Sequence, residues 1–128
     1  MQRTQYVDLW IIRASEDIDA AEALLEAGGP WNPICFHAQQ AAEKYLKAFL
    51  AFHNKNVGKI HQLDSLASDC ELIDKEFITL REDAIHLTHF YISTRYPADI
   101  PTYGKTDAKH ALEAARRISE FVSKKIVK

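Results

Sequence analysis

The sequence has few of the residues that cross-link or interrupt a chain. Its 128 residues include two cysteines, four glycines and four prolines. Two cysteines cannot build the disulfide framework of a small secreted domain, so Cys35 and Cys70 are expected to be reduced, buried thiols in a cytoplasmic protein. Because glycine and proline are scarce, turns should be rare and the elements between them long.

Long apolar runs and an excess of basic charge are also lacking. No run of 18 apolar residues is present, and residues 1–5 have no apolar segment behind their charge. We therefore expect neither a membrane span nor a signal peptide. The formal net charge is -2, which excludes a global positive field that would attract nucleic acid. A polyanion site would have to be a local cluster.

Apolar residues instead recur at the spacing of amphipathic helices, and no segment alternates with the period of a strand. The pattern predicts helices over about 6–27, 33–53, 63–70, 74–91 and 106–127. We expect an all-α fold, an up-and-down helical bundle of four long helices plus one short helix, in a single domain over residues 1–128.

The second predicted helix is the centre of this bundle. Its apolar side spans roughly 200° of the circumference, so several neighbours must cover it. A narrow polar strip remains, marked by Gln40, Lys44 and Lys47 and bordered by His37 and Glu43. Asn32 is expected to cap this helix ahead of Pro33. Phe36 projects on the polar side, which predicts contact with a second copy and hence a homodimer.

The segment after the fourth helix carries the strongest candidate for chemistry. Residues 95–103 hold one arginine, two tyrosines and Asp99, stiffened by two prolines. Arginine binds phosphate in bidentate fashion, and a neighbouring tyrosine can stack on a base. An alternative is a structural turn in which Arg95 pairs with Asp99 and both tyrosines pack on the bundle. The residues alone favour neither.

Other candidates are weaker. His86 and His89 have a spacing that can chelate a metal, but no third ligand lies at a readable distance, so no metal or cofactor is expected. His61 precedes the short helix and is interpreted as a cap or packing residue. Nothing in the sequence matches a phosphate-binding glycine loop or a nucleophile elbow.

Three segments together resemble the HEPN domain family (higher eukaryotes and prokaryotes nucleotide-binding). Residues 36–48, FHAQQAAEKYLKA, are similar to its central-helix signature. His61-Gln62-Leu63 is similar to a short element that follows it, and Thr94-Arg95-Tyr96-Pro97-Ala98-Asp99 resembles the segment after the fourth helix. The resemblance implies a bundle of about five helices, commonly dimeric and often encoded beside a minimal nucleotidyltransferase, as in toxin–antitoxin pairs. Some members of the superfamily are metal-independent endoribonucleases.

The sequence departs from the ribonuclease pattern, an arginine followed by four to six residues and a histidine. No histidine lies at that distance after Arg95, and only Arg81 with His86 satisfies the spacing, inside a hydrophobic helix. We therefore expect a nucleotide- or RNA-binding partner of a nucleotidyltransferase without strong catalysis. The expected contacts to phosphate or base come from six residues: Arg95, Tyr96, Asp99, Tyr103, Lys44 and His37. An endoribonuclease toxin and a purely structural dimeric module remain alternatives.

Overall fold

The computed structural model describes residues 2–90 and 97–127, and every regular element in these two ranges is helical. The elements in chain order are α1 (Gln5–Glu26), α2 (Trp31–Phe52), α3 (Leu63–Ile73), the 3-10 helix η1 (Lys75–Leu80), α4 (Arg81–Thr88), the 3-10 helix η2 (Pro97–Asp99) and α5 (Lys105–Lys125). The predicted all-α bundle is confirmed. The predicted fourth helix begins as η1, whose start is capped by the Asp74 carboxylate accepting from the Glu76 amide, and continues as α4.

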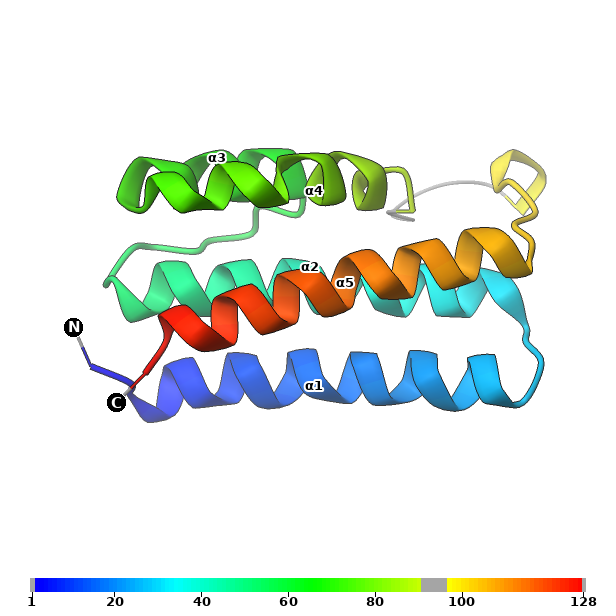
Figure 1. Cartoon of the computed structure of the whole chain (residues 1–128), viewed down its shortest axis with the longest axis horizontal. Helices are drawn as coiled ribbons and strands as arrows, with labels where there is room; N and C mark the ends of the chain where they lie inside the picture. Colours follow the sequence, from blue (N-terminus) through cyan, green and yellow to red (C-terminus); the bar gives the residue numbers. More distant parts are fainter. Residues whose placement is uncertain (1, 91–96, 128) are drawn as a thin grey trace.

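Helix α2 lies at the centre of the bundle, as its broad apolar circumference predicts. It runs between α1 on one side and the α3 and α4 pair on the other, and α5 lies across it (Figure 1). Both chain termini are at the end of the bundle where α2 finishes (Figure 1). Three aromatic rings join the elements at that end: Phe49 stacks at 4.4 Å from Phe77, which meets Phe121 at 4.8 Å.

The turn between α1 and α2 depends on two glycines. Gly28 and Gly29 have φ angles of +88° and +113°, a region that L side chains rarely adopt. Their amides donate to the carbonyls of Leu25 and Leu24 in the last turn of α1, which pairs these two terminal groups. This arrangement gives the antiparallel α1–α2 hairpin that the sequence predicts.

The expected cap of α2 is wrong by two residues. Pro30, whose backbone is extended, occupies the cap position, so Asn32 lies inside the first turn of the helix. Its side chain is therefore available to hold the segment ahead of α5. The Asn32 amide nitrogen donates to the Pro101 carbonyl oxygen at 2.8 Å, and its oxygen accepts from the Tyr103 amide at 2.8 Å.

The two cysteines are buried, unpaired thiols, as expected. Burial raises the pKa of Cys35 to about 11, and it raises the pKa of Cys70 further. Among the described helices, none is long and apolar enough to cross a membrane.

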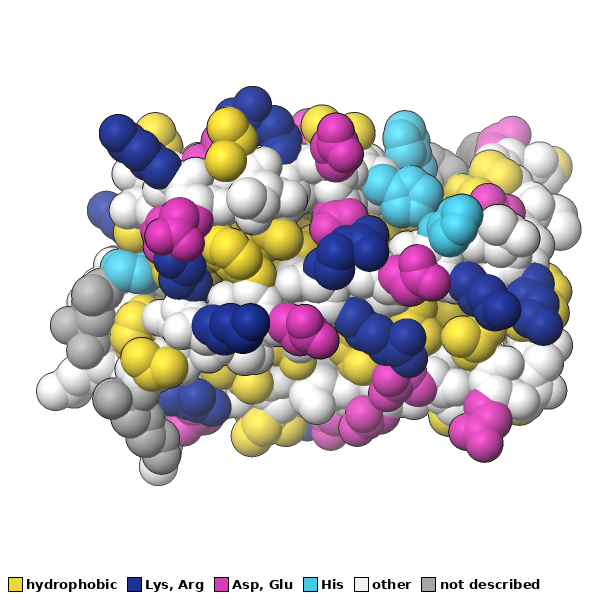
Figure 2. All heavy atoms as spheres, viewed as in Figure 1, with side chains coloured by type: hydrophobic (Ala, Val, Ile, Leu, Met, Phe, Trp, Pro, Cys, Tyr) yellow, Lys and Arg dark blue, Asp and Glu magenta, His cyan; other side chains and the backbone are white. Residues whose placement is uncertain are grey.

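The face of the molecule that α5 crosses carries both positive and negative side chains rather than charge of one sign (Figure 2). Arg116 donates two hydrogen bonds to Glu22 of α1, and Arg117 forms a fork with Asp83 of α4. These arginines join neighbouring helices and are already occupied. The face shown in Figure 2 is therefore a poor candidate for a polyanion site.

Candidate functional site

The unusual feature of α2 is a row of polar side chains that runs into the core. Gln39, Glu43 and Lys47 are spaced by one helical turn each, and their exposed fractions are 0%, 4% and 2%. With the partly buried Gln40 and Lys44 they form the α2 polar strip. The sequence marks most of this strip as polar, and a polar strip on a helix normally faces solvent. Here three of its five side chains are buried, which is energetically costly unless the polar groups are paired.

The buried charges pair with each other and with one histidine. The Lys47 ammonium donates to Glu43 Oε2 at 3.0 Å, and His61 Nδ1 lies 3.0 Å from the same oxygen. The side chains of Glu43 and Lys47 are almost fully enclosed, whereas that of His61 is 45% exposed. The segment between α2 and α3 therefore brings an accessible imidazole onto a buried carboxylate.

Pairing is incomplete inside the strip. Glu43 Oε1 and Gln39 Nε2 are both buried and have no hydrogen-bond partner among the described residues. The Gln39 oxygen is used, because it accepts from Gln40 at 2.7 Å. Native proteins leave few buried polar atoms unpaired, and such atoms need an explanation, for example a ligand that completes them.

The outer border of the strip contacts α1 through a second charged group. The Lys44 ammonium donates to Asp17 Oδ2 at 2.6 Å, and His37 Nδ1 lies 2.9 Å from Asp17 Oδ1. The side chains of Lys44 and His37 are 25% and 32% exposed. An ammonium has three donors, and Asp17 occupies one, so Lys44 keeps donors for a further acceptor at the surface.

The predicted site residues fall into two groups. Lys44 and His37 share Asp17 at the border of the strip. Asp99 is exposed at the end of η2. Tyr103 is half-buried, and its ring packs on Phe90 at 4.8 Å near the end of α4.

Arg95 and Tyr96, the two other predicted contacts, lie outside the described residues. They are therefore not assigned to the strip. Their assignment to phosphate or base contacts stays a prediction from the sequence.

The arginine and histidine with ribonuclease-like spacing do not contact the strip. Arg81 forms a fork with Glu71 of α3 at 3.0 and 2.8 Å. That ion pair lowers the pKa of Glu71 and raises the pKa of Arg81. His86 is exposed and its ring meets Phe90 edge-on at 5.5 Å. In the described ranges, no group of three or more histidine, cysteine or acidic side chains could hold a metal ion.

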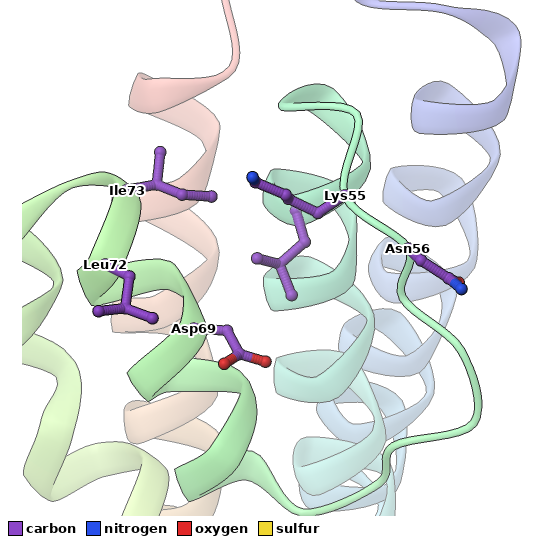
Figure 3. A pocket seen from close by; sticks show the side chains of 6 residues that line it. Lys55, Asn56, Asp69, Leu72 and Ile73 are labelled. Atoms are coloured by element: carbon purple, nitrogen blue, oxygen red, sulfur yellow. The ribbon is translucent and has the colours of Figure 1, made fainter.

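A separate hollow of about 350 Å³ lies between α3 and the segment that follows α2. Lys55 and Asp69 lie on its rim, and Leu72 and Ile73 line it from α3 (Figure 3). It is lined by one cation, one carboxylate, one amide and apolar side chains, and none of its polar residues is buried. The α2 polar strip is chemically richer, and we take it as the candidate site.

Comparison with known proteins agrees with this architecture. The sequence profile of the HEPN domain matches residues 7–126. The chain belongs to the HEPN domain family. The crystal structure of an archaeal HEPN homologue has a TM-score of 0.78 to this HEPN chain at 27% sequence identity, and the match covers 99% of this chain and 100% of that one. Among curated proteins none matches the sequence significantly.

Sequence reasoning on this HEPN domain missed the burial of Glu43 and Lys47 and the role of His61. One signal was present: Gln39, Glu43 and Lys47 recur every four residues beside the apolar face. A row of that kind forms a stripe on one side of a helix. A helix with neighbours on most sides has little room for an exposed polar stripe. The central position expected for α2 was therefore a signal that part of the stripe is buried.

Proposed function

We propose that this HEPN protein binds a nucleotide or RNA at the α2 polar strip and works with a minimal nucleotidyltransferase in a toxin–antitoxin-like pair, without strong catalysis of its own. The observation that carries the proposal is the buried, incompletely paired charge of the strip. Glu43 and Gln39 each leave a buried polar atom unpaired, while Lys44 and His37 present partly exposed donors beside them.

The energetics favour function over stability as the reason for this arrangement. Burying an ion pair costs several kcal/mol of desolvation per ion, and the mutual attraction of the pair offsets this cost only in part. An apolar pair of similar size would stabilise the same helix interface at least as well. This cost supports a binding role for the strip rather than a purely structural one.

Phosphate is the group that best fits the border of the strip. Lys44 supplies a fixed ammonium because its Nζ donates to Asp17 of α1. His37 on the same carboxylate can add a second polar contact from its imidazole ring. A phosphate at this place would be bound without a long-range positive field, which agrees with the net charge of -2.

The proposed partners are a second copy of the chain and a nucleotidyltransferase. Family membership supports the first of these, since HEPN domains commonly dimerise. Large apolar side chains also remain exposed on this protomer, among them Leu72 on α3 and Ile78 on η1. Light scattering of the purified protein and mass spectrometry of co-purifying proteins test these two proposals separately.

The test of the binding proposal uses wild type and two lysine variants. Nucleotides extracted from the purified protein are identified by mass spectrometry, and binding of a labelled single-stranded RNA is measured by fluorescence anisotropy. Lys44→Ala is expected to weaken binding roughly tenfold, the loss of one charge-assisted hydrogen bond. Lys124→Ala, at an exposed position near the end of α5, is the matched control and should bind like wild type. Equal binding by wild type and Lys44→Ala would contradict the assignment of the site.

One observation favours the endoribonuclease as a second candidate. His61 is accessible, and Glu43 fixes its ring through Nδ1, the arrangement that orients a histidine for general acid–base catalysis. Such an enzyme would cleave RNA in the presence of EDTA, and His61→Gln would abolish cleavage while leaving RNA binding intact. If wild type does not cleave RNA under these conditions, the binding function stands alone.

A further inference from the structure

A small aromatic hollow lies on α1 next to the buried end of the polar strip. Its lining consists of Tyr6, Leu9, Trp10 and Arg13, and its volume is about 160 Å³. Tyr6 is 55% exposed, and its ring meets that of Trp10 edge-on at 6.1 Å. These four residues are called the Trp10 hollow below. They recur at helical spacing on one face of α1, which is why they meet.

Trp10, which lines the hollow, contacts Lys47 of the α2 polar strip. The Lys47 ammonium lies 5.4 Å from the centre of the Trp10 ring, a cation–π contact that fixes the ring. The indole Nε1 of Trp10 is buried and has no hydrogen-bond partner among the described residues. Because Nε1 itself is enclosed, the part of Trp10 that lines the hollow is apolar ring surface.

We propose that the Trp10 hollow binds the base of a single nucleotide and that Arg13 binds its phosphate. The inference rests on the proposed function and names a ligand and a subsite for it. Tyr6 and Trp10 supply the ring contacts on which a base stacks. Arg13, whose side chain is 56% exposed, supplies the bidentate fork.

The size of the hollow favours a base over a protein helix. A water molecule occupies about 30 Å³ of liquid, so 160 Å³ is the space of roughly five waters, enough for one flat ring system. A partner helix would need an apolar groove along α1. Instead the exposed Glu16 comes three residues after Arg13 on the same helix.

The charge around the hollow favours a single nucleotide over a long strand. Arg13 already shares its charge with Glu16 at 3.0 Å, and Asp8 directly precedes Leu9 of the hollow on α1. A long polyanion would be repelled by these carboxylates, whereas one phosphate needs only one fork. Binding should therefore depend only weakly on salt, because a single phosphate has no condensed counterions to release.

The experiment uses Trp10 as its own reporter. The chain contains two tryptophans, so Trp31→Phe leaves Trp10 alone. AMP, GMP, CMP and UMP are titrated against this protein, and each is compared with its nucleoside. We expect saturable quenching of Trp10 fluorescence by at least one nucleotide, and tighter binding of that nucleotide than of its nucleoside.

Two further substitutions in the Trp31→Phe protein locate the ligand. Tyr6→Ala should weaken binding about 5- to 150-fold by loss of one stacking ring. Arg13→Ala should remove the preference for the nucleotide over the nucleoside. Ile12→Ala is the matched control, because Ile12 is exposed on α1 but does not line the hollow. Tyr6 is exposed as well, so its variant is expected to fold, and circular dichroism checks this.

The possible results separate this inference from the proposed function. If no nucleotide quenches Trp10 up to about 1 mM while RNA still binds through Lys44, the Trp10 hollow is not a base site and the proposed function stands. If neither RNA nor nucleotide binds, both fail. If Tyr6→Ala converts a dimer to a monomer and no quenching is seen, the hollow is an interface between copies and the inference is overturned.

Discussion

The buried pair of Glu43 and Lys47 allows function and stability to be separated by mutation. Lys47→Met keeps the length of the side chain but leaves the Glu43 carboxylate, which is 4% exposed, with His61 as its remaining described partner. Removing one member of a buried pair costs about 3–5 kcal/mol, because the other charge stays desolvated. We expect the lower end of this range, since the contact of His61 with Glu43 remains.

This loss in the free energy of unfolding of Lys47→Met corresponds to a large decrease in melting temperature. At an unfolding entropy of about 2.1 cal/mol/K per residue, a chain of 128 residues melts roughly 11 °C lower for a loss of about 3 kcal/mol. Glu43→Leu alone should destabilise by a similar amount, because it leaves the Lys47 ammonium buried and unpaired. Differential scanning calorimetry measures both single variants against wild type.

The double variant Glu43→Leu/Lys47→Met gives the decisive result. Replacing both members of a buried pair by apolar side chains of similar size is often neutral or stabilising. We therefore expect the double variant to melt within a few degrees of wild type, although each single variant melts well below it. If the double variant instead loses the sum of the two single losses, the pair is a structural element and our reasoning about the strip is wrong.

Three further predictions concern the rest of the molecule. Because burial raises the pKa of Cys35 to about 11 and that of Cys70 further, neither thiol of the native protein should react with Ellman's reagent at neutral pH, and both should react after denaturation; a fast native reaction would contradict the burial. The hydrogen bond from Lys125 lowers the pKa of Asp74 below its ordinary value, so this contribution to stability is present above about pH 4 and is lost as the pH falls through the lower folded-state pKa. Asp74→Asn should therefore be less stable than wild type at neutral pH, and the difference should shrink in acid denaturation series below about pH 4; a constant difference would refute it. Arg95→Ala should leave the melting temperature nearly unchanged but weaken nucleotide or RNA binding roughly ten- to hundredfold, and unfolding with unchanged binding would show a structural role instead.

Much of the fold could be predicted because local signals act within single segments. The 3.6-residue period, the paired glycines after α1 and the two scarce prolines in the segment ahead of α5 each fix a boundary to within a few residues. The breadth of the apolar side of α2 also predicts its central position. The N-cap of α2 was predicted wrongly. Both Pro30 and Asn32 are plausible caps, and the turn geometry before the helix decides which of them takes this role.

The site was predictable only in part, for a physical reason. Lys44 and His37 were expected at a binding surface, and the structure brings both to Asp17, a residue twenty or more positions away in the chain. His61 on Glu43 is likewise a contact between two elements. Spacing within one helix can show that polar groups share a face. Which neighbour covers that face depends on the packing of other helices, and a single sequence does not encode this in any local pattern.

The most direct test of the central claim is the affinity of the Glu43→Leu/Lys47→Met double variant for single-stranded RNA and for nucleotides, measured by anisotropy and by Trp10 fluorescence on protein of verified melting temperature. The account predicts a folded protein with wild-type-like stability whose affinity falls at least roughly tenfold, because the strip is retained for binding and not for folding. A double variant that is equally stable and binds as tightly as wild type would contradict it.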